Sequence, residues 1–153
     1  MSSYVERVLQ PGEQVRHLAT IHWIIYLPGL VILVLSLVVL IAGNAYPVSA
    51  PVWEILSAIL AAIALIVIFR AWFYRWITEI AVTDRRVIYK TGFIRRETNE
   101  MHMDKVESVR VEQSILGRIL DYGDVKVLGT GEGFETIRTI AAPLDLRNHI
   151  TGR

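Results

Sequence analysis

The sequence predicts an α+β membrane protein in which a two-helix transmembrane hairpin carries a small antiparallel β domain with a C-terminal helix. Two observations support this fold class. Hydrophobic residues make up 53% of the 153-residue chain and charged residues only 20%, with a mean hydropathy of +0.42, which is unusual for a soluble domain. The apolar excess is concentrated in residues 23–42 and 52–69. We therefore expect a juxtamembrane segment over residues 1–22, a helical hairpin over 23–76 and a cytoplasmic β domain over 77–153.

The first span is predicted over about residues 23–42. This run has no charged side chain, and about 20 helical residues are enough to cross a hydrocarbon core of roughly 30 Å. A cleaved signal peptide fits less well, because the preceding segment carries Glu6 and Glu13 and a second apolar run follows. We expect the segment to be retained as a membrane helix.

The second span is predicted over about residues 52–72. It ends in the aromatic and cationic border 70–76, of a kind found at the headgroup level. The connection between the spans, residues 43–51, contains no Lys or Arg, whereas both flanks of the hairpin do. The positive-inside rule then places both termini in the cytoplasm.

After the hairpin, the hydrophobic period changes from helical to alternating, which predicts short β-strands joined in antiparallel hairpins. Turn residues at Asp84-Arg85, 91–93 and 129–133 separate them. The apolar strand positions are Ile80/Val82, Val87/Tyr89, Met101/Met103, Val109/Val111, Val125/Val127 and Ile137.

Two short helices are expected in this domain. The first is capped by Ser114 and stopped by Gly123, and we expect its apolar face, which includes Leu116, to pack on the sheet. The second begins at Pro143 and has Leu146 and Ile150 on one face.

Four short motifs are distinctive in this chain. The most specific is the Gln-Ser-x-Leu-Gly-Arg-x-Leu-x-Tyr-Gly stretch over residues 113–123. The others are Leu-Gln-Pro-Gly-Glu at 9–13, Val-Thr-Asp-Arg-Arg-Val-Ile-Tyr at 82–89 with Gly92 after it, and Val-Leu-Gly-Thr-Gly at 127–131. Together they resemble the motifs of the bacterial pleckstrin-homology-like (PH-like) membrane family, also called bPH2 or DUF304.

The resemblance implies a curved antiparallel sheet closed by a C-terminal helix, in relatives with no known enzymatic reaction. It also implies a bacterial inner membrane location, as a multi-pass protein. The soluble part is shorter than a full seven-stranded PH domain, so juxtamembrane residues 13–20 are a candidate for a missing strand.

Catalytic or metal chemistry is not indicated. The four histidines lack metal-ligand spacing, the chain has no cysteine, and the glycines at 129–133 lack the Lys-Ser/Thr of a phosphate loop. Asp104, Glu107 and Glu112 are better read as a solvated face. We expect no enzyme activity, no catalytic residue, no metal, no cofactor and no nucleic-acid partner.

Charge is distributed unevenly in the second half of the chain. Residues 70–96 hold seven bases and two acids, a net +5, whereas residues 97–153 hold seven bases and ten acids, a net −3. Positive-inside topology alone explains such a pattern. The same pattern also makes the basic residues of 70–96 candidates for contact with anionic lipid or with a partner. These residues are Arg70, Arg75, Arg85, Arg86, Lys90, Arg95 and Arg96.

Two functional hypotheses follow. In the first, the protein is a membrane-anchored interaction or scaffold module that forms homo-oligomers or docks onto a larger membrane protein complex. In the second, the basic juxtamembrane face makes it a sensor of lipid headgroups or of the membrane surface. We favour the first, because about 75 soluble residues form a small core that gains from the membrane or from a partner.

Overall fold

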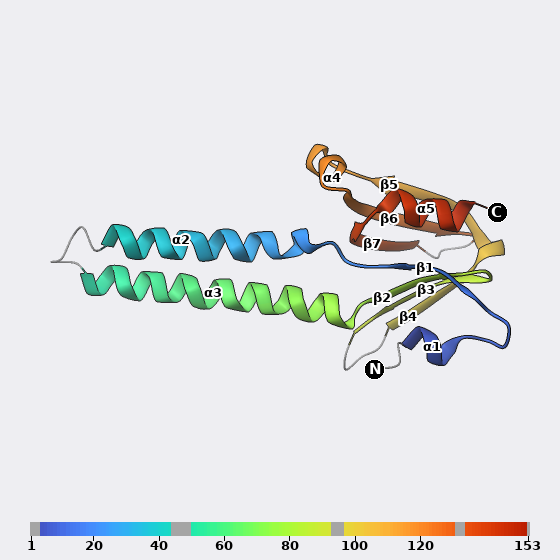
Figure 1. Ribbon diagram of the computed structural model, residues 1–153, viewed down its shortest axis with the longest axis horizontal. Coiled ribbons are helices and arrows are strands. Elements are labelled where there is room, and N and C mark those ends of the chain that lie inside the picture. Colours follow the sequence, from blue (N-terminus) through green and yellow to red (C-terminus); the bar gives the residue numbers. More distant parts are fainter. Residues whose placement is uncertain (1–3, 44–49, 93–96, 131–133, 153) are drawn as a thin grey trace. The chain divides into compact units, whose positions relative to one another are not determined.

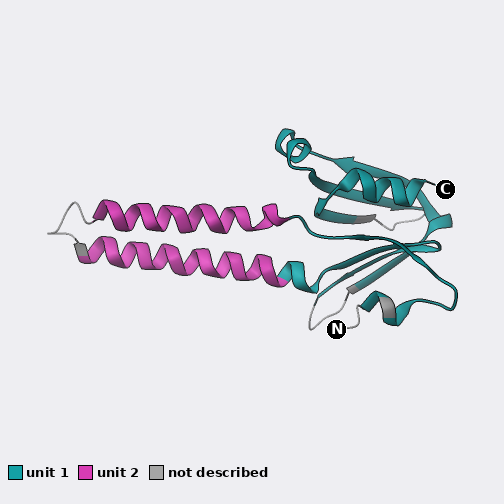
Figure 2. Ribbon diagram, in the orientation of Figure 1, with its two compact units in different colours: residues 1–22, 74–153 teal, residues 23–73 magenta. Residues whose placement is uncertain are grey.

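The computed structural model describes residues 4–43, 50–92, 97–130 and 134–152. Contacts divide the chain into two compact units (Figure 2): residues 1–22 with 74–153, and residues 23–73. The segment before the first apolar helix therefore belongs to the same unit as the β domain.

The smaller unit is an apolar helical hairpin. A 3₁₀ turn over Trp23–Tyr26 leads into helix α2, Leu27–Gly43, and helix α3 spans Ala50–Ile77. The stretches Trp23–Gly43 and Pro51–Ile77 are long and apolar enough to cross a membrane. The two helices approach closely: a Cβ added at Gly29 would lie 2.5 Å from Ile68 Cγ1, and Ser36 Oγ donates to Ser57 O at 2.9 Å. Small residues at the contact permit this close approach of the two helices.

The larger unit contains two antiparallel sheets (Figure 1). The first has the order β1-β2-β3-β4 and the second β5-β6-β7. Their bounds are Val15–Ala19 for β1, Glu79–Thr83 for β2, Arg86–Thr91 for β3, Glu97–His102 for β4, Val106–Glu112 for β5, Tyr122–Gly129 for β6 and Phe134–Ala141 for β7. In the part of the unit that the structure describes, the α-helices α1, Tyr4–Val8, α4, Ile115–Ile119, and α5, Pro143–Thr151, complete the fold.

Strand β1 lies in residues 13–20, the juxtamembrane segment that the sequence offered as a candidate for a missing strand. It pairs with β2 through a register that includes Ala19 opposite Ile80. Beyond it the chain pairs with β7: Ile21 bridges Ile140, and Ala141 N donates to Thr20 O at 3.0 Å. The candidate strand in residues 13–20 is thus confirmed, and it links the two sheets.

The core lies between the sheets and under α5. Val82, Val125 and Ile137 are each 0% exposed in this core. Ile88 is also 0% exposed, but it lies with Ala81 on the other face of the first sheet, packed against Val5 of α1, because successive side chains of a strand point to opposite faces. Helix α5 begins at Pro143 and buries Leu146 and Ile150, which confirms its predicted start and face. It contacts β5, β6, β1 and β2.

Three local predictions are wrong. Met103 lies in a 3₁₀ turn over Met103–Lys105 instead of a strand. Gly123 does not end α4: the helix ends at Ile119, and Gly123 is buried within β6. Leu116 is 62% exposed, so α4 does not pack its apolar face on the sheet.

The predicted cap of α4 is confirmed, because Gly117 N donates to Ser114 Oγ at 3.0 Å. The predicted turns 91–93 and 129–133 extend outside the described residues.

Candidate functional site

The basic residues nominated by the sequence do not share one environment. Arg70 and Arg75 are exposed on α3, and Arg85 is exposed in the turn between β2 and β3. Arg95 and Arg96 lie outside the described residues. The remaining two, Arg86 and Lys90, are engaged within the domain.

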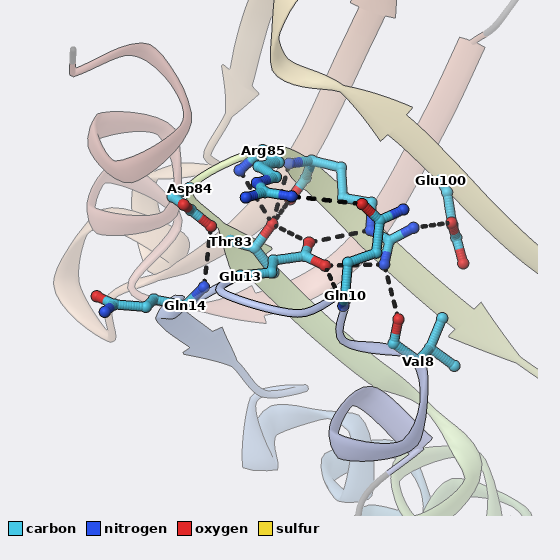
Figure 3. A network of polar contacts seen from close by, with 9 residues as sticks. Val8, Gln10, Glu13, Gln14, Thr83, Asp84, Arg85 and Glu100 are labelled. Carbon is cyan, nitrogen blue, oxygen red and sulfur yellow. Dashed lines mark hydrogen bonds and ion pairs between the residues drawn. The ribbon is translucent and has the colours of Figure 1, made fainter.

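Arg86 is buried and bonded on all three guanidinium nitrogens. Nε and Nη2 donate to the two carboxylate oxygens of Glu13 at 3.0 and 2.9 Å, a bidentate arrangement that suits the guanidinium fork. Nη1 donates to Glu100 Oε2 at 2.7 Å, and Nη2 also donates to Val8 O at 2.8 Å. This Glu13–Arg86–Glu100 cluster (Figure 3) joins the N-terminal segment to β3 and β4.

The Glu13 carboxylate has two further donors: Gln10 N at 2.8 Å and Thr83 Oγ1 at 2.7 Å. Burial alone would raise its pKa, but these hydrogen bonds and Arg86 together lower the pKa of Glu13 below its ordinary value. The carboxylate is therefore held in its charged form. The motifs at 9–13 and 82–89 thus meet in space, and they fix the N-terminal segment to the β2–β3 turn.

Lys90 fixes the start of the same segment. Its Nζ lies 3.0 Å from Glu79 Oε1 and 5.0 Å from the centroid of the Tyr4 ring. The other oxygen of Glu79 accepts from Tyr4 N at 2.8 Å, and Val5 packs against Ala81 and Ile88. Lys90 therefore has partners within the domain, and its charge is not directed at an external anion.

A cleft of about 160 Å³ opens between the two sheets. Its lining is mainly apolar, with Glu100 as the charged member, and comprises Val87, Tyr89, Asn99, Glu100, Met101, Val127 and Ile137. Successive side chains of a strand point to opposite faces, yet three consecutive residues of β4 line this cleft. The cleft therefore follows the edge of β4, which is the last strand of its sheet among the described residues.

Glu100 connects the cleft to the buried cluster. Arg86 holds one carboxylate oxygen, while 30% of the Glu100 side chain stays exposed. The site thus offers apolar walls, a strand edge and a fixed carboxylate acceptor at its rim. Such a combination suits an extended peptide segment better than a phosphate group, which the carboxylate would repel.

Sequence reasoning missed this site because it treated Arg86 as a surface cation. One signal was available: Arg86 directly precedes the apolar run Val87–Tyr89 in β3, and Glu13 follows a Pro-Gly turn. Among the described residues, no group of three or more His, Asp or Glu side chains is placed to hold a metal ion.

Comparison with known proteins identifies the family. Neither a curated protein nor a solved structure matches the chain. The family model of the bacterial PH domain matches residues 18–153, which include both apolar helices and all described strands after β1. The chain therefore belongs to the bacterial PH domain family (bPH_2).

Proposed function

We propose that this protein is a membrane-anchored PH-like interaction or scaffold module, which docks onto a larger membrane protein complex or onto further copies of itself. Its hairpin crosses the bacterial inner membrane twice, and both termini and the β domain lie in the cytoplasm. The cleft along the edge of β4 is the observation that carries the docking role.

Membrane insertion is supported by the surface of the hairpin. Large apolar side chains such as Ile41 and Ile55 are 70% and 62% exposed, and water-soluble proteins rarely leave such continuous apolar surface uncovered. The orientation is supported by Arg7 and Arg16 before the first helix and Arg75 in the last turn of the second, with no Lys or Arg in residues 43–51.

Docking is supported by the chemistry of the cleft. A partner strand beside β4 would extend the first sheet through main-chain hydrogen bonds, and one of its side chains would enter the apolar cleft. Glu100 would accept a hydrogen bond from a backbone N–H or a basic side chain of that segment. The basic-face sensor is the weaker alternative, because Arg86 and Lys90 already have carboxylate partners.

A site-specific photocrosslinker tests the docking role. Placed at the exposed Asn99, which lines the cleft, it should yield one discrete adduct in cells. The same probe at the exposed Ser108 of β5 is the matched control and should yield none. The adduct mass distinguishes a second copy from another protein. No adduct at Asn99, or equal adducts at both positions, would count against docking at this cleft.

Topology is tested separately, using the absence of native cysteine. A cysteine at Ser49, which lies outside the described residues, should react with an impermeant maleimide from the periplasmic side. A cysteine at Thr151, exposed on α5, should be protected until the membrane is opened. Labelling of Thr151 in sealed cells would reverse the orientation.

A further inference from the structure

Helix α4 presents large apolar side chains to the outside. Ile115 is 82% exposed, Ile119 73% and Leu116 62%, in a helix only five residues long. In Figure 1, α4 lies in the connection between β5 and β6, at one end of the second sheet. Packing within the domain therefore does not explain why large apolar residues occupy these positions.

The backbone of this segment is firmly held. Ser114 caps the helix through Gly117 N, and Gln113 Nε2 donates to Gly117 O at 3.3 Å and to Tyr122 O at 3.2 Å. A Cβ at Gly117 would lie 2.6 Å from Tyr122 O, so the turn closes tightly only with glycine there. The apolar side chains are therefore displayed in a fixed arrangement.

The end of α4 lies where the chain leaves the domain for the first apolar helix. The ring of His22 stacks on Tyr122 with centroids 5.2 Å apart, and His22 N donates to Thr139 O at 2.7 Å. The backbone of Leu120 also hydrogen-bonds to His22, and the charge of Arg75 acts on the same ring. His22 directly precedes Trp23, the first residue of the candidate span Trp23–Gly43.

The surroundings of α4 combine apolar and cationic side chains. Leu144, which is 43% exposed, lines a hollow of about 420 Å³. Arg118 and Arg147 line the same hollow, together with one acid, Asp121. Exposed aliphatic side chains beside arginines are typical of elements that lie at a membrane interface, where the cations meet phosphates.

We propose that α4 is an interfacial membrane anchor: Ile115, Leu116 and Ile119 enter the headgroup–acyl boundary of the bilayer that the hairpin spans. The proposal rests on the membrane insertion of the hairpin and is independent of the docking cleft. A bilayer is the occupant that the structure favours, because Leu120 and Tyr122 contact the residue next to the span.

Lipid quenching in reconstituted full-length protein tests this proposal. The variants Ile119→Cys, Leu35→Cys and Thr130→Cys each carry a small fluorophore, in bilayers whose acyl chains are brominated near the headgroup, brominated near the chain end or not brominated. Leu35 is exposed on α2 and reports insertion of the hairpin. Thr130 is exposed just beyond the far end of β6, about 26 Å from Tyr122 at 3.3 Å per residue, and serves as the control within the domain.

The expected result is quenching at Ile119 by bromines near the headgroup and at Leu35 by bromines near the chain end, with none at Thr130. Quenching at Leu35 without quenching at Ile119 would overturn the anchor while leaving the hairpin in the membrane. If unlabelled Ile119→Cys protein were then joined between copies by a disulfide on treatment with a mild oxidant such as copper phenanthroline, the apolar face of α4 would be an interface with a second copy. No quenching at Leu35 would overturn the proposed membrane insertion and, with it, the anchor.

Discussion

The Glu13–Arg86–Glu100 cluster and helix α4 differ in which side chains they bury: the cluster buries charged side chains, whereas α4 exposes large apolar ones. In the cluster, the side chain of Glu13 is 0% exposed and that of Arg86 is 7% exposed. In α4, Ile115 is 82% exposed. A charged pair is therefore inside the domain while one of its largest apolar side chains is outside.

The difference follows from the contacts that each region makes within the domain. The cluster joins segments more than 70 positions apart in the chain, and its charges are tolerated because every guanidinium nitrogen and both Glu13 oxygens have partners. Helix α4 joins neighbouring strands, and its backbone and cap are satisfied without its apolar side chains. Those side chains are free to contact something outside the domain.

The largest effect is expected from breaking the buried pair. Arg86→Met leaves the Glu13 carboxylate buried without its main partner, at a cost of about 3–5 kcal/mol. Lys126→Met is the matched control, because its pair with Glu112 is 2.7 Å long but lies at the surface, where such pairs contribute about 0–1 kcal/mol. Thermal unfolding of the β domain in detergent-solubilised protein measures both. Equal losses would mean that Arg86 is not the main partner of a buried charge.

A smaller loss is expected at the turn of α4. Gly117→Ala places a Cβ about as close to Tyr122 O as the 2.6 Å found for an ideal position, and such overpacking costs about 1–3 kcal/mol. Arg118→Ala, at an exposed neighbouring position, should change stability by less than about 0.5 kcal/mol. Chemical unfolding of the two variants compares them. Similar stabilities would show that the turn relaxes around the added methyl group.

The sequence predicts the elements better than their partners. Alternation places apolar residues in six strands, with the exception of Met103, and the Pro143 start and Leu146/Ile150 face of α5 are confirmed, because period and capping are local properties. The sequence pattern does not reveal that Arg86 is buried, because its partner Glu13 lies 73 positions away in the chain. Leu116 was misread because helical spacing reports an apolar face and does not say what covers it.

Acid should weaken the domain before it affects the buried pair. Burial lowers the pKa of His17 from 6.5, and His149, stacked at 4.4 Å, lowers it further, while Asp145 opposes. Because the unfolded chain binds this proton more readily, stability is complete above pH 6.5, falls as the pH drops from 6.5 toward the lowered pKa, and loses nothing more to His17 below that pKa. Glu13 adds a loss only below pH 4.5.

His17→Gln tests this ordering, because it removes a group whose protonation weakens the domain at a higher pH than protonation of Glu13 does. The variant should lose stability less steeply than the parent between pH 6.5 and 5, with the loss from Glu13 below pH 4.5 unchanged. Unfolding midpoints across this range supply the measurement. Parallel profiles for variant and parent would assign the acid sensitivity to other groups, among them His22, whose pKa is also lowered by burial.

The smallest effect on folding is expected on the exposed face of α4. Leu116 is 62% exposed, so Leu116→Asp should change the free energy of unfolding by no more than about 0.5 kcal/mol. Leu146→Asp is the matched control: Leu146 is 0% exposed, and burying a carboxylate there should cost several kcal/mol. Both are measured in detergent, where no bilayer contributes. A loss at Leu116 as large as at Leu146 would mean that α4 belongs to the core, and the contrast between the two regions would disappear. A stable Leu116→Asp variant would instead show that its apolar side chain is not needed for folding, which leaves contact with an external surface as its role.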